Sequence, residues 1–487
     1  MLRTRLIAPY QHTGVRWLAE REVGEHAGGF LCDEMGLGKT VQMLATMCIN
    51  QRQKTLVIAP KSVVSQWRQE IRRFVPSFKV HVYDGPKRQL PAFTANESWV
   101  VVAPYSVLVQ RKGKPESPLV SIGWDRVILD EAHEIRNRAS GVHKACLSLR
   151  ARIRWCLSGT PIFNSMKDFV ALGAFLGFTK SEVQGFTNEI RAKYVLRRTK
   201  HDVSEFNKRL ELPPCDFQNV ELEMYQEERT LYEDAFSRGR EVVQNVAAST
   251  NQHMFQMQLL EALLRVRQVM AWPQMYLDGI AKKQETEPEP WTGRSRKMEV
   301  IMDMIKSHPK EKALVFCQFI GEMDRIQELL RDAEIPTYRI DGGVDKEQRE
   351  SRIDAFKETT YGRQPVFLIQ IKSGGVGLNL QQATRVYITS PAWNPATELQ
   401  AIARAHRTGQ TQKVTVRKLI YTGEEGGVTP DGKIRQALPS VEESILALQE
   451  SKTKVCAEVL NDSRVLAQMP LANPKVTIHT LKKIFRV

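Results

Sequence analysis

Several features that mark other classes of protein are scarce or missing in this chain of 487 residues. Its seven cysteines include no C-x-x-C pair, which argues against a structural zinc module. Their odd number and their positions inside apolar runs indicate reduced, buried thiols. The most apolar window, residues 169–178, has about half the length needed to span a bilayer. We therefore expect an intracellular protein that has no disulfides and does not contact a membrane.

Acidic residues are also few relative to basic ones. Asp and Glu number 55 against 70 Lys and Arg, which leaves a net charge of +15 and a pI near 9.4. This excess favours a polyanionic partner over a metabolite, although simple solubility would also explain a charge that is not confined to one block. The chain is globular by its 42% hydrophobic content. Because it is too long for one core, we expect two domains with additions.

One stretch, GGFLCDEMGLGKT at residues 28–40, has the composition of a phosphate-binding loop. Glycines let backbone N–H groups face phosphate oxygens, and a helix that begins near Lys39 adds its positive N-terminal end. We expect Lys39 to reach the β and γ phosphates of ATP, and Thr40 to give its hydroxyl to Mg²⁺. The strict G-x-x-x-x-G-K-[ST] pattern is broken because Asp33 stands in place of the first glycine. The candidate nucleotide contacts in this loop are Asp33, Gly36, Leu37, Gly38, Lys39 and Thr40.

A second stretch, RVILDEAH at residues 126–133, is predicted to be a buried strand that ends in two acids. Asp130 can hold Mg²⁺ there, and Glu131 can orient and deprotonate the attacking water. Adjacent acids are common on surfaces, but a charge pair after a buried strand needs a cation or a partner. Together with Lys39, the pair favours a catalytic role.

Further strands are expected at 55–60, 99–104 and 155–161, and their alternation with helices predicts a parallel, doubly wound sheet. Lys61 and Ser62 follow the first of these strands, at the edge where ligands bind, and Ser62 can cap the next helix. With Thr160 they are candidate nucleic-acid contacts, and the alternatives are a solvated lysine at 61 and an ordinary strand-to-turn sequence at 160. Upstream of the loop, the Gln11 amide could pair with the adenine edge, or belong to a surface turn.

From residue 187 to 290 the pattern is helical without strand signals, and it ends in a linker rich in Glu, Pro and Lys. A second alternating series follows without a GKT tripeptide or paired acids, so this lobe is not expected to hold ATP by itself. Its strands are expected at 312–319, 337–343, 366–380, 385–391 and 414–421. The predicted domains are an ATP-binding lobe at 1–200, a helical insertion and linker at 201–290, a second lobe at 291–430, and a helical basic extension at 431–487.

Residues 394–410, NPATELQAIARAHRTGQ, predict a helix from about 395 to 408. Gln400, Arg404 and Arg407 would then share one face, and two guanidiniums suit the charge of a phosphoryl-transfer transition state. A pair of surface arginines is the alternative. A glycine loop nearby could approach the nucleotide through Gly377 or a sugar-phosphate chain through Lys372 and Ser373.

The motifs DEMGLGKT, DEAH, LSGTP, SGGVGLNL and QAIARAHRTGQ, in this order, resemble those of the SNF2 family of superfamily 2 helicase-like ATPases, with some similarity to its Rad5/Rad16-like branch. The resemblance covers residues 6–421 and implies two RecA-like lobes with ATP and Mg²⁺ between them. It implies movement along double-stranded DNA, action on nucleosomes or other protein–DNA complexes, and a nuclear location. It assigns adenine contact to Gln11, phosphate and Mg²⁺ contacts to Gly36, Gly38, Lys39, Thr40 and Asp130, water activation to Glu131, and arginine fingers to Arg404 and Arg407.

Two other functions fit the same motifs. DEAH also occurs in RNA-unwinding enzymes, so an RNA-dependent ATPase or helicase is one alternative. A scaffold that clamps DNA around a nucleotide without turnover is the other, although intact Lys39, Asp130 and Glu131 argue against it. We expect a monomer. The absence of a RING zinc module leaves the recognition of a target open.

Overall fold

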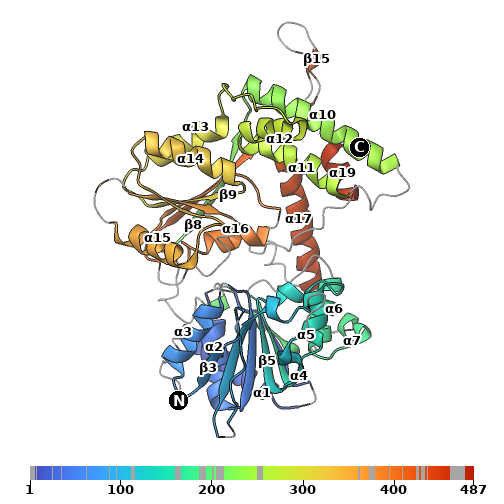
Figure 1. The fold of residues 1–487 in the computed structure, drawn as a ribbon, viewed down its shortest axis with the longest axis vertical. Helices are drawn as coiled ribbons and strands as arrows, with labels where there is room; N and C mark the ends of the chain where they lie inside the picture. The colour runs from blue at the N-terminus through green and yellow to red at the C-terminus, as the bar shows by residue number, and fades with distance from the viewer. Residues whose placement is uncertain are drawn as a thin grey trace. The chain divides into compact units, whose positions relative to one another are not determined.

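The structure is a computed structural model (Figure 1). The chain folds into two compact units, one mainly Met1–Leu212 and the other mainly Pro213–His406 with Gln410–Lys454. The described residues are 6, 8–24, 26–34, 36–61, 63–86, 88–94, 96–110, 116–158, 166–185, 193–199, 202–203, 213–248, 256–359, 362, 364–371, 379–393, 395–407, 410–423, 427–428, 434–435, 437–460 and 478–487.

The first unit is built on a sheet of seven strands, all paired in parallel, in the order β3-β4-β2-β5-β6-β1-β7. Its central strands are Val, Ile and Leu runs because both faces of the sheet are covered. Trp67, Met43 and Leu18 belong to the core on one face, so α1, α2 and α3 pack there. The strands are β1 (Gly28–Leu31), β2 (Lys54–Ala59), β3 (Lys79–Val82), β4 (Trp99–Pro104), β5 (Gly123–Asp130), β6 (Arg150–Leu157) and β7 (Val195–Leu196); the helices are α1 (Pro9–Arg21), α2 (Lys39–Ile49), α3 (Val64–Phe74), α4 (Pro118–Ser121), α5 (Gly141–Leu147), α6 (Met166–Phe175) and α7 (Lys180–Gln184).

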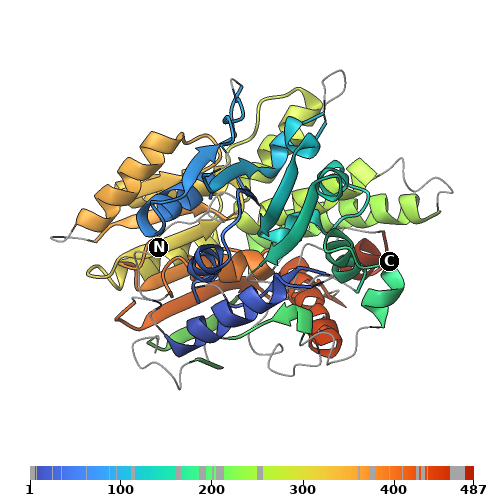
Figure 2. The same cartoon turned by 90° about the horizontal axis from the view of Figure 1, so that it is seen from below.

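The second unit has a six-stranded sheet, again all parallel, in the order β10-β11-β9-β12-β13-β8. The orange strands in Figure 2 belong to this sheet. The predicted pair of doubly wound, RecA-like lobes is therefore confirmed. The strands are β8 (Cys215–Leu222), β9 (Ala313–Cys317), β10 (Thr337–Ile340), β11 (Val366–Gln370), β12 (Arg385–Ile388) and β13 (Val414–Tyr421), and a separate hairpin pairs β14 (Gly427–Val428) with β15 (Ile434–Arg435); the helices are α10 (Gln226–Ala248), α11 (Gln256–Ala271), α12 (Gln274–Gln284), α13 (Arg296–Lys306), α14 (Ile320–Asp332), α15 (Lys346–Glu358), α16 (Pro395–Ile402), α17 (Val441–Leu460) and α19 (Ile478–Phe485).

The expectation that residues 187–290 contain no strand is wrong. They include β7 and β8, and β8 pairs along its whole length with β13, from Val414 opposite Cys215 to Tyr421 opposite Leu222. β8 is an edge strand whose middle residues are exposed, so its polar sequence CDFQNVEL lacks the apolar run that marks a buried strand. The helices α10, α11 and α12 that follow it are as expected, and they cluster with the second unit. The predicted limits of the domains stay predictions.

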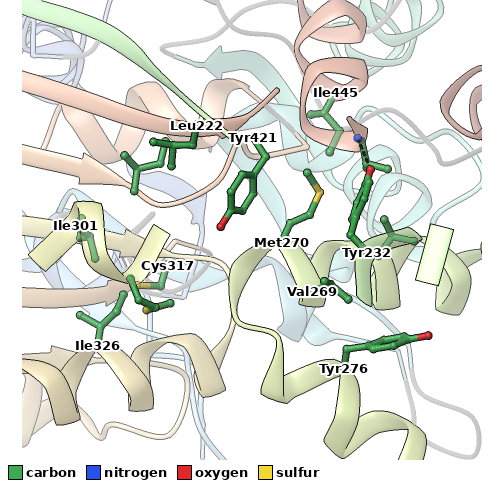
Figure 3. Close-up of a cluster of buried hydrophobic side chains, with 14 of the residues drawn as sticks. Leu222, Tyr232, Val269, Met270, Tyr276, Ile301, Cys317, Ile326, Tyr421 and Ile445 are labelled. Atoms are coloured by element: carbon green, nitrogen blue, oxygen red, sulfur yellow. Dashed lines mark hydrogen bonds between the residues drawn. The ribbon is translucent and has the colours of Figure 1, made fainter. Parts of the chain in front are cut away.

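A buried core joins α10, α11 and α17 to the second sheet (Figure 3). In this view Met270 lies between Tyr421 and Tyr232. The Tyr232 hydroxyl donates to Pro439 O at 2.8 Å and accepts from Val441 N–H at 3.0 Å, which fixes the start of α17. Among helices in the described part of the chain, none is both long and apolar enough to cross a membrane.

Candidate nucleotide-binding site

The loop after β1 turns directly into α2, as its sequence predicts. Gly36 and Gly38 both have left-handed backbones, with φ of 92° and 78°, which side chains other than glycine rarely adopt. Gly38 is also the residue that precedes the first turn of α2, so Lys39 and Thr40 open the helix. A Cβ on Gly38 would lie 2.7 Å from Gln11 Nε2. This position therefore requires glycine for its conformation and for the space that Gln11 occupies.

Gln11 is held against this loop by hydrogen bonds. Its side chain is buried, 3% exposed, which rules out the surface turn that was the alternative. Its Nε2 donates to Leu37 O at 3.4 Å, and the Tyr10 hydroxyl donates to the same carbonyl at 3.1 Å. α1 thus brings Gln11 to the loop, while its contact with adenine stays a prediction.

Lys39 lies along the loop that it follows. Its Nζ donates to the backbone carbonyl of Asp33 at 2.8 Å. The Asp33 carboxylate is fully buried and accepts from Gln42 Nε2 at 3.0 Å and from Arg198 Nε at 3.0 Å. Asp33 was expected to contact the nucleotide, but its side chain is engaged with protein groups. Its contribution to the loop is therefore made through Arg198 and Gln42.

The two acids lie at the carboxyl end of β5, on the same edge of the sheet as the loop. Asp130 pairs in register with Leu157, and Leu31 at the end of β1 pairs with the same residue from the other side. With strands spaced by about 4.8 Å, Asp130 and the start of the loop are separated by about 10 Å. The structure therefore brings together the two motifs that were expected to share Mg²⁺ and ATP.

Three groups position Asp130. Trp67 Nε1 donates to its Oδ2 at 2.7 Å, the Tyr105 hydroxyl donates to its carbonyl at 2.8 Å, and Glu131 N–H donates to its Oδ1 at 3.0 Å. Burial, and then the adjacent charge of Glu131, raise the pKa of Asp130 to about 6, although Trp67 and Lys39 work in the opposite direction. Burial and a neighbouring like charge both disfavour the ionised form of a carboxylate, and a bound cation would stabilise that form. This site fits Mg²⁺.

Glu131 has a strained backbone at the same place. Its φ of 49° lies in the left-handed region, which is uncommon for a residue with a side chain. Its Oε2 lies 3.3 Å from His133 Nδ1. Burial disfavours a charged imidazole, but the carboxylate of Glu131 outweighs it and raises the pKa of His133. Glu131 follows Asp130 directly at the carboxyl end of β5, so it lies at the edge of the sheet where the loop lies.

Other candidate residues are placed less fully. Lys61 is exposed and follows β2 at the same edge of the sheet. Ser62, Thr160, Lys372, Ser373 and Gly377 lie outside the described residues. The first helix after β2 begins at Val64, with Val63 rather than Ser62 preceding it.

The predicted helix over 395–408 is too long. α16 ends at Ile402, and Arg404 lies in the turn that follows, 4% exposed. The carbonyl of Arg404 accepts from Leu380 N–H at 3.1 Å, a contact from outside the helix. Gln400, Arg404 and Arg407 are therefore not on one face of a single helix, and the finger role of the two arginines stays a prediction.

Sequence patterns alone missed four residues of this site: Trp67, Tyr105, His133 and Arg198. Trp67 is a buried residue of α3, and nothing in the pattern of that helix predicts that its indole N–H donates to Asp130, 63 positions away. Arg198 lies in a basic segment, YVLRRTKHDV at residues 194–203, whose composition does not predict these contacts. The one signal for it was the acid at position 33, because a buried aspartate requires a partner.

The SNF2-related domain matches residues 10–193 and 180–275, and the helicase conserved C-terminal domain matches residues 296–409. The chain belongs to the SNF2 family. It is therefore a helicase-like ATPase core and an ATP hydrolase, and the expected family is confirmed. A "probable global transactivator" of Orgyia pseudotsugata multicapsid polyhedrosis virus is 29% identical over 88% of each chain. The "putative ATP-dependent helicase/translocase YwqA" of Bacillus subtilis is 29% identical over 95% of this chain, and the chain spans 50% of it.

Other SNF2-family relatives are longer. The "ISWI chromatin-remodeling complex ATPase ISW1" of Saccharomyces cerevisiae is 28% identical over 94% of this chain, which spans 41% of that protein. Among solved structures, a Sulfolobus solfataricus SWI2/SNF2 ATPase core in complex with dsDNA shares 25% identity over 99% of this chain and 97% of its own, with a TM-score of 0.40. A TM-score this low does not establish a shared fold, so the fold is assigned from the strand order of the two parallel sheets.

Proposed function

We propose that this SNF2-family chain is a DNA-stimulated ATPase that moves along double-stranded DNA and thereby remodels nucleosomes or other protein–DNA complexes. The observation that carries the proposal is the register that brings the Lys39 loop and the Asp130–Glu131 pair to one edge of the first sheet. The net charge of +15 supports a nucleic-acid partner. The chain spans 50% of the Bacillus subtilis relative and 41% of ISW1, so its action on nucleosomes belongs to this proposal alone.

The residues of the site have distinct roles in this proposal. Loop amides and Lys39 bind the phosphates, and Gln11 orients the adenine. Asp130 and Thr40 would hold Mg²⁺, which neutralises charge on the β and γ phosphates when bound. Glu131 accepts a proton from the attacking water, and Arg404 and Arg407 stabilise the charge on the γ phosphate. Lys61, with Ser62, Thr160, Lys372 and Ser373, contacts DNA phosphates, which would make binding sequence-independent.

The test compares ATP turnover by the whole chain with duplex DNA, single-stranded DNA, RNA and nucleosomes. Duplex DNA should stimulate most, and the stimulation should fall steeply with salt because phosphate contacts dominate. Stimulation by RNA alone would establish the RNA-dependent alternative. No turnover with any nucleic acid would establish the scaffold instead.

Lys39→Ala should abolish turnover and leave duplex binding unchanged. Turnover equal to that of the wild type would overturn the assignment of this loop. A nuclear location and a monomeric state belong to the same proposal. The Bacillus subtilis relative comes from an organism without a nucleus, so fractionation and sedimentation of the native protein are the tests.

A further inference from the structure

Arg198, just beyond β7, makes a concentrated set of contacts around the nucleotide loop. Its Nε donates to Asp33 Oδ1 at 3.0 Å, and its Nη2 donates to Asp33 Oδ2. The same Nη2 donates to Gln42 Oε1 at 2.7 Å, and Nη1 donates to the carbonyl of Tyr10. One guanidinium thereby joins the loop, α2 and α1. A fork of five N–H donors is what allows a single side chain to do this.

The backbone of the same segment also holds the loop. Cys32 N–H donates to Leu196 O at 2.7 Å, and Glu34 N–H donates to Arg198 O at 2.9 Å. These two bonds continue the parallel pairing of β1 with β7 into the first half of the loop. Substitution of the Arg198 side chain would leave the backbone pairing in place, so the contribution of the guanidinium can be measured by itself.

The groups that Arg198 holds converge on one atom of the loop. Gln42 Nε2 donates to Leu37 O at 3.2 Å, and the Tyr10 hydroxyl donates to the same oxygen at 3.1 Å. Leu37 precedes Gly38, the residue that starts α2. The Arg198 contacts are therefore relayed to the point at which the loop becomes a helix and Lys39 begins.

A glycine on α1 gives independent evidence for this arrangement. A Cβ on Gly14 would lie 2.0 Å from Gln42 Oε1 and 2.7 Å from Arg198 Nη2. Any side chain at this position would drive the two groups apart. α1 therefore has a glycine in its interior, at a cost of about 1 kcal/mol in helix propensity, at the point where Arg198 and Gln42 meet.

We propose that Arg198 is a positioning residue for nucleotide binding, which fixes the phosphate loop and the Gln11 helix in one arrangement, with Asp33 as its buried counter-ion. The inference rests on the proposed function only in that the loop binds a nucleotide. It assigns Asp33, which replaces the usual glycine, to Arg198 instead of to the ligand. Because Arg198 touches the loop and not the reacting atoms, its loss should weaken binding more than it slows chemistry.

The test measures the dissociation constant of a fluorescent ADP analogue with Mg²⁺, and KM and kcat for ATP, in Arg198→Gln and Arg198→Lys. Arg198→Gln should raise the dissociation constant and KM about tenfold or more, with kcat changed less than about threefold. Arg198→Lys should lie between it and the wild type, because an ammonium cannot bind the carboxylate in two places. Arg152→Gln is the matched control, because Arg152 is an exposed arginine near the amino end of β6, away from the loop.

Two further variants keep the test decisive if Arg198→Gln fails to fold. Gly14→Ala should also raise the dissociation constant. Asp33→Asn combined with Arg198→Lys should lower the binding free energy by less than the sum of the two single changes, because both remove the same interaction. A wild-type dissociation constant in Arg198→Lys and Gly14→Ala, or a loss confined to kcat, would overturn the inference. A wild-type chain that binds the ADP analogue but is not stimulated by any nucleic acid would overturn the proposed function alone.

Discussion

Two of the charged side chains on strand β5, Arg126 and Asp130, have opposite environments. Arg126 is buried, and its ion pair with Glu22 leaves neither group exposed to water. Arg126 Nε donates to Glu22 Oε1 at 2.6 Å, and Trp155 Nε1 donates to the same oxygen at 3.0 Å. Asp130, four residues and about 13 Å further along the strand, has no cationic side chain in direct contact among the described residues, and its pKa is raised to about 6.

This difference separates structural charges from functional ones. At the amino half of the strand, Arg126 is paired with Glu22, the residue that caps the end of α1, so this pair holds the end of α1 against the sheet. At the carboxyl end, two adjacent carboxylates are kept together in spite of their repulsion, with a strained backbone at Glu131. Burial without full compensation is typical of catalytic and metal sites. The comparison predicts that changes at the two ends of β5 have opposite effects on activity and stability.

The largest effect is expected for Glu131→Gln. Removal of the proton acceptor should lower kcat by about 10³-fold, while loss of a repelled charge should leave the melting temperature unchanged or higher. Steady-state ATPase assays and thermal unfolding check this, with the exposed Glu134→Gln as control. A kcat within threefold of the wild type would remove Glu131 from the chemistry.

Arg126→Met should have the converse result. It leaves Glu22 buried without its cation, so the free energy of unfolding of the first unit should fall by about 3–5 kcal/mol. The kcat of the folded fraction should stay near that of the wild type. Urea unfolding followed by tryptophan fluorescence measures the loss, and Arg152→Met should change it by less than about 0.5 kcal/mol. If Arg126→Met is as stable as the wild type, the buried pair does not hold α1.

The pH dependence should reveal the charge at the other end of the strand. Asp130 takes up a proton as pH falls through about 6, so affinity for Mg²⁺ should fall about tenfold per pH unit below that value. Trp67→Phe removes a hydrogen bond to the charged form and should move this limb to higher pH. Because the pKa of Asp130 in the folded protein lies above its ordinary value of 3.8, the Asp130 contribution to stability should improve on acidification through pH 6, the reverse of a salt-bridged acid. Titration of Mg²⁺ binding between pH 5 and 8 measures the fall in affinity and its shift in Trp67→Phe. Thermal unfolding over the same pH range measures the change in stability.

The smallest effect is expected at the exposed edge beside Asp130. Lys61→Ala should raise KM for duplex DNA about two- to fivefold and reduce the salt dependence by about one phosphate contact. Turnover without DNA should not change. Binding isotherms at several salt concentrations test this, and an unchanged salt slope would assign Lys61 to solvent.

The parts of the site that were predicted correctly are those carried by neighbouring residues. The turn from β1 into α2 and the acids at the end of β5 follow from local rules of glycine conformation, strand burial and helix initiation. The edge strand β8 and the end of α16 were not predicted correctly, because β13 supplies the partner of the first and Leu380 the partner of the second. Neither partner is near in the sequence.

The amino-acid sequence by itself determined the family, the two parallel sheets and the positions of Lys39, Asp130 and Glu131, since each depends on residues within one turn or strand. Only the tertiary structure decided which buried charges are neutralised. The pairs Glu22 with Arg126 and Asp33 with Arg198 span 104 and 165 positions. The cost of a buried charge depends on the groups around it in space, and no local pattern contains them.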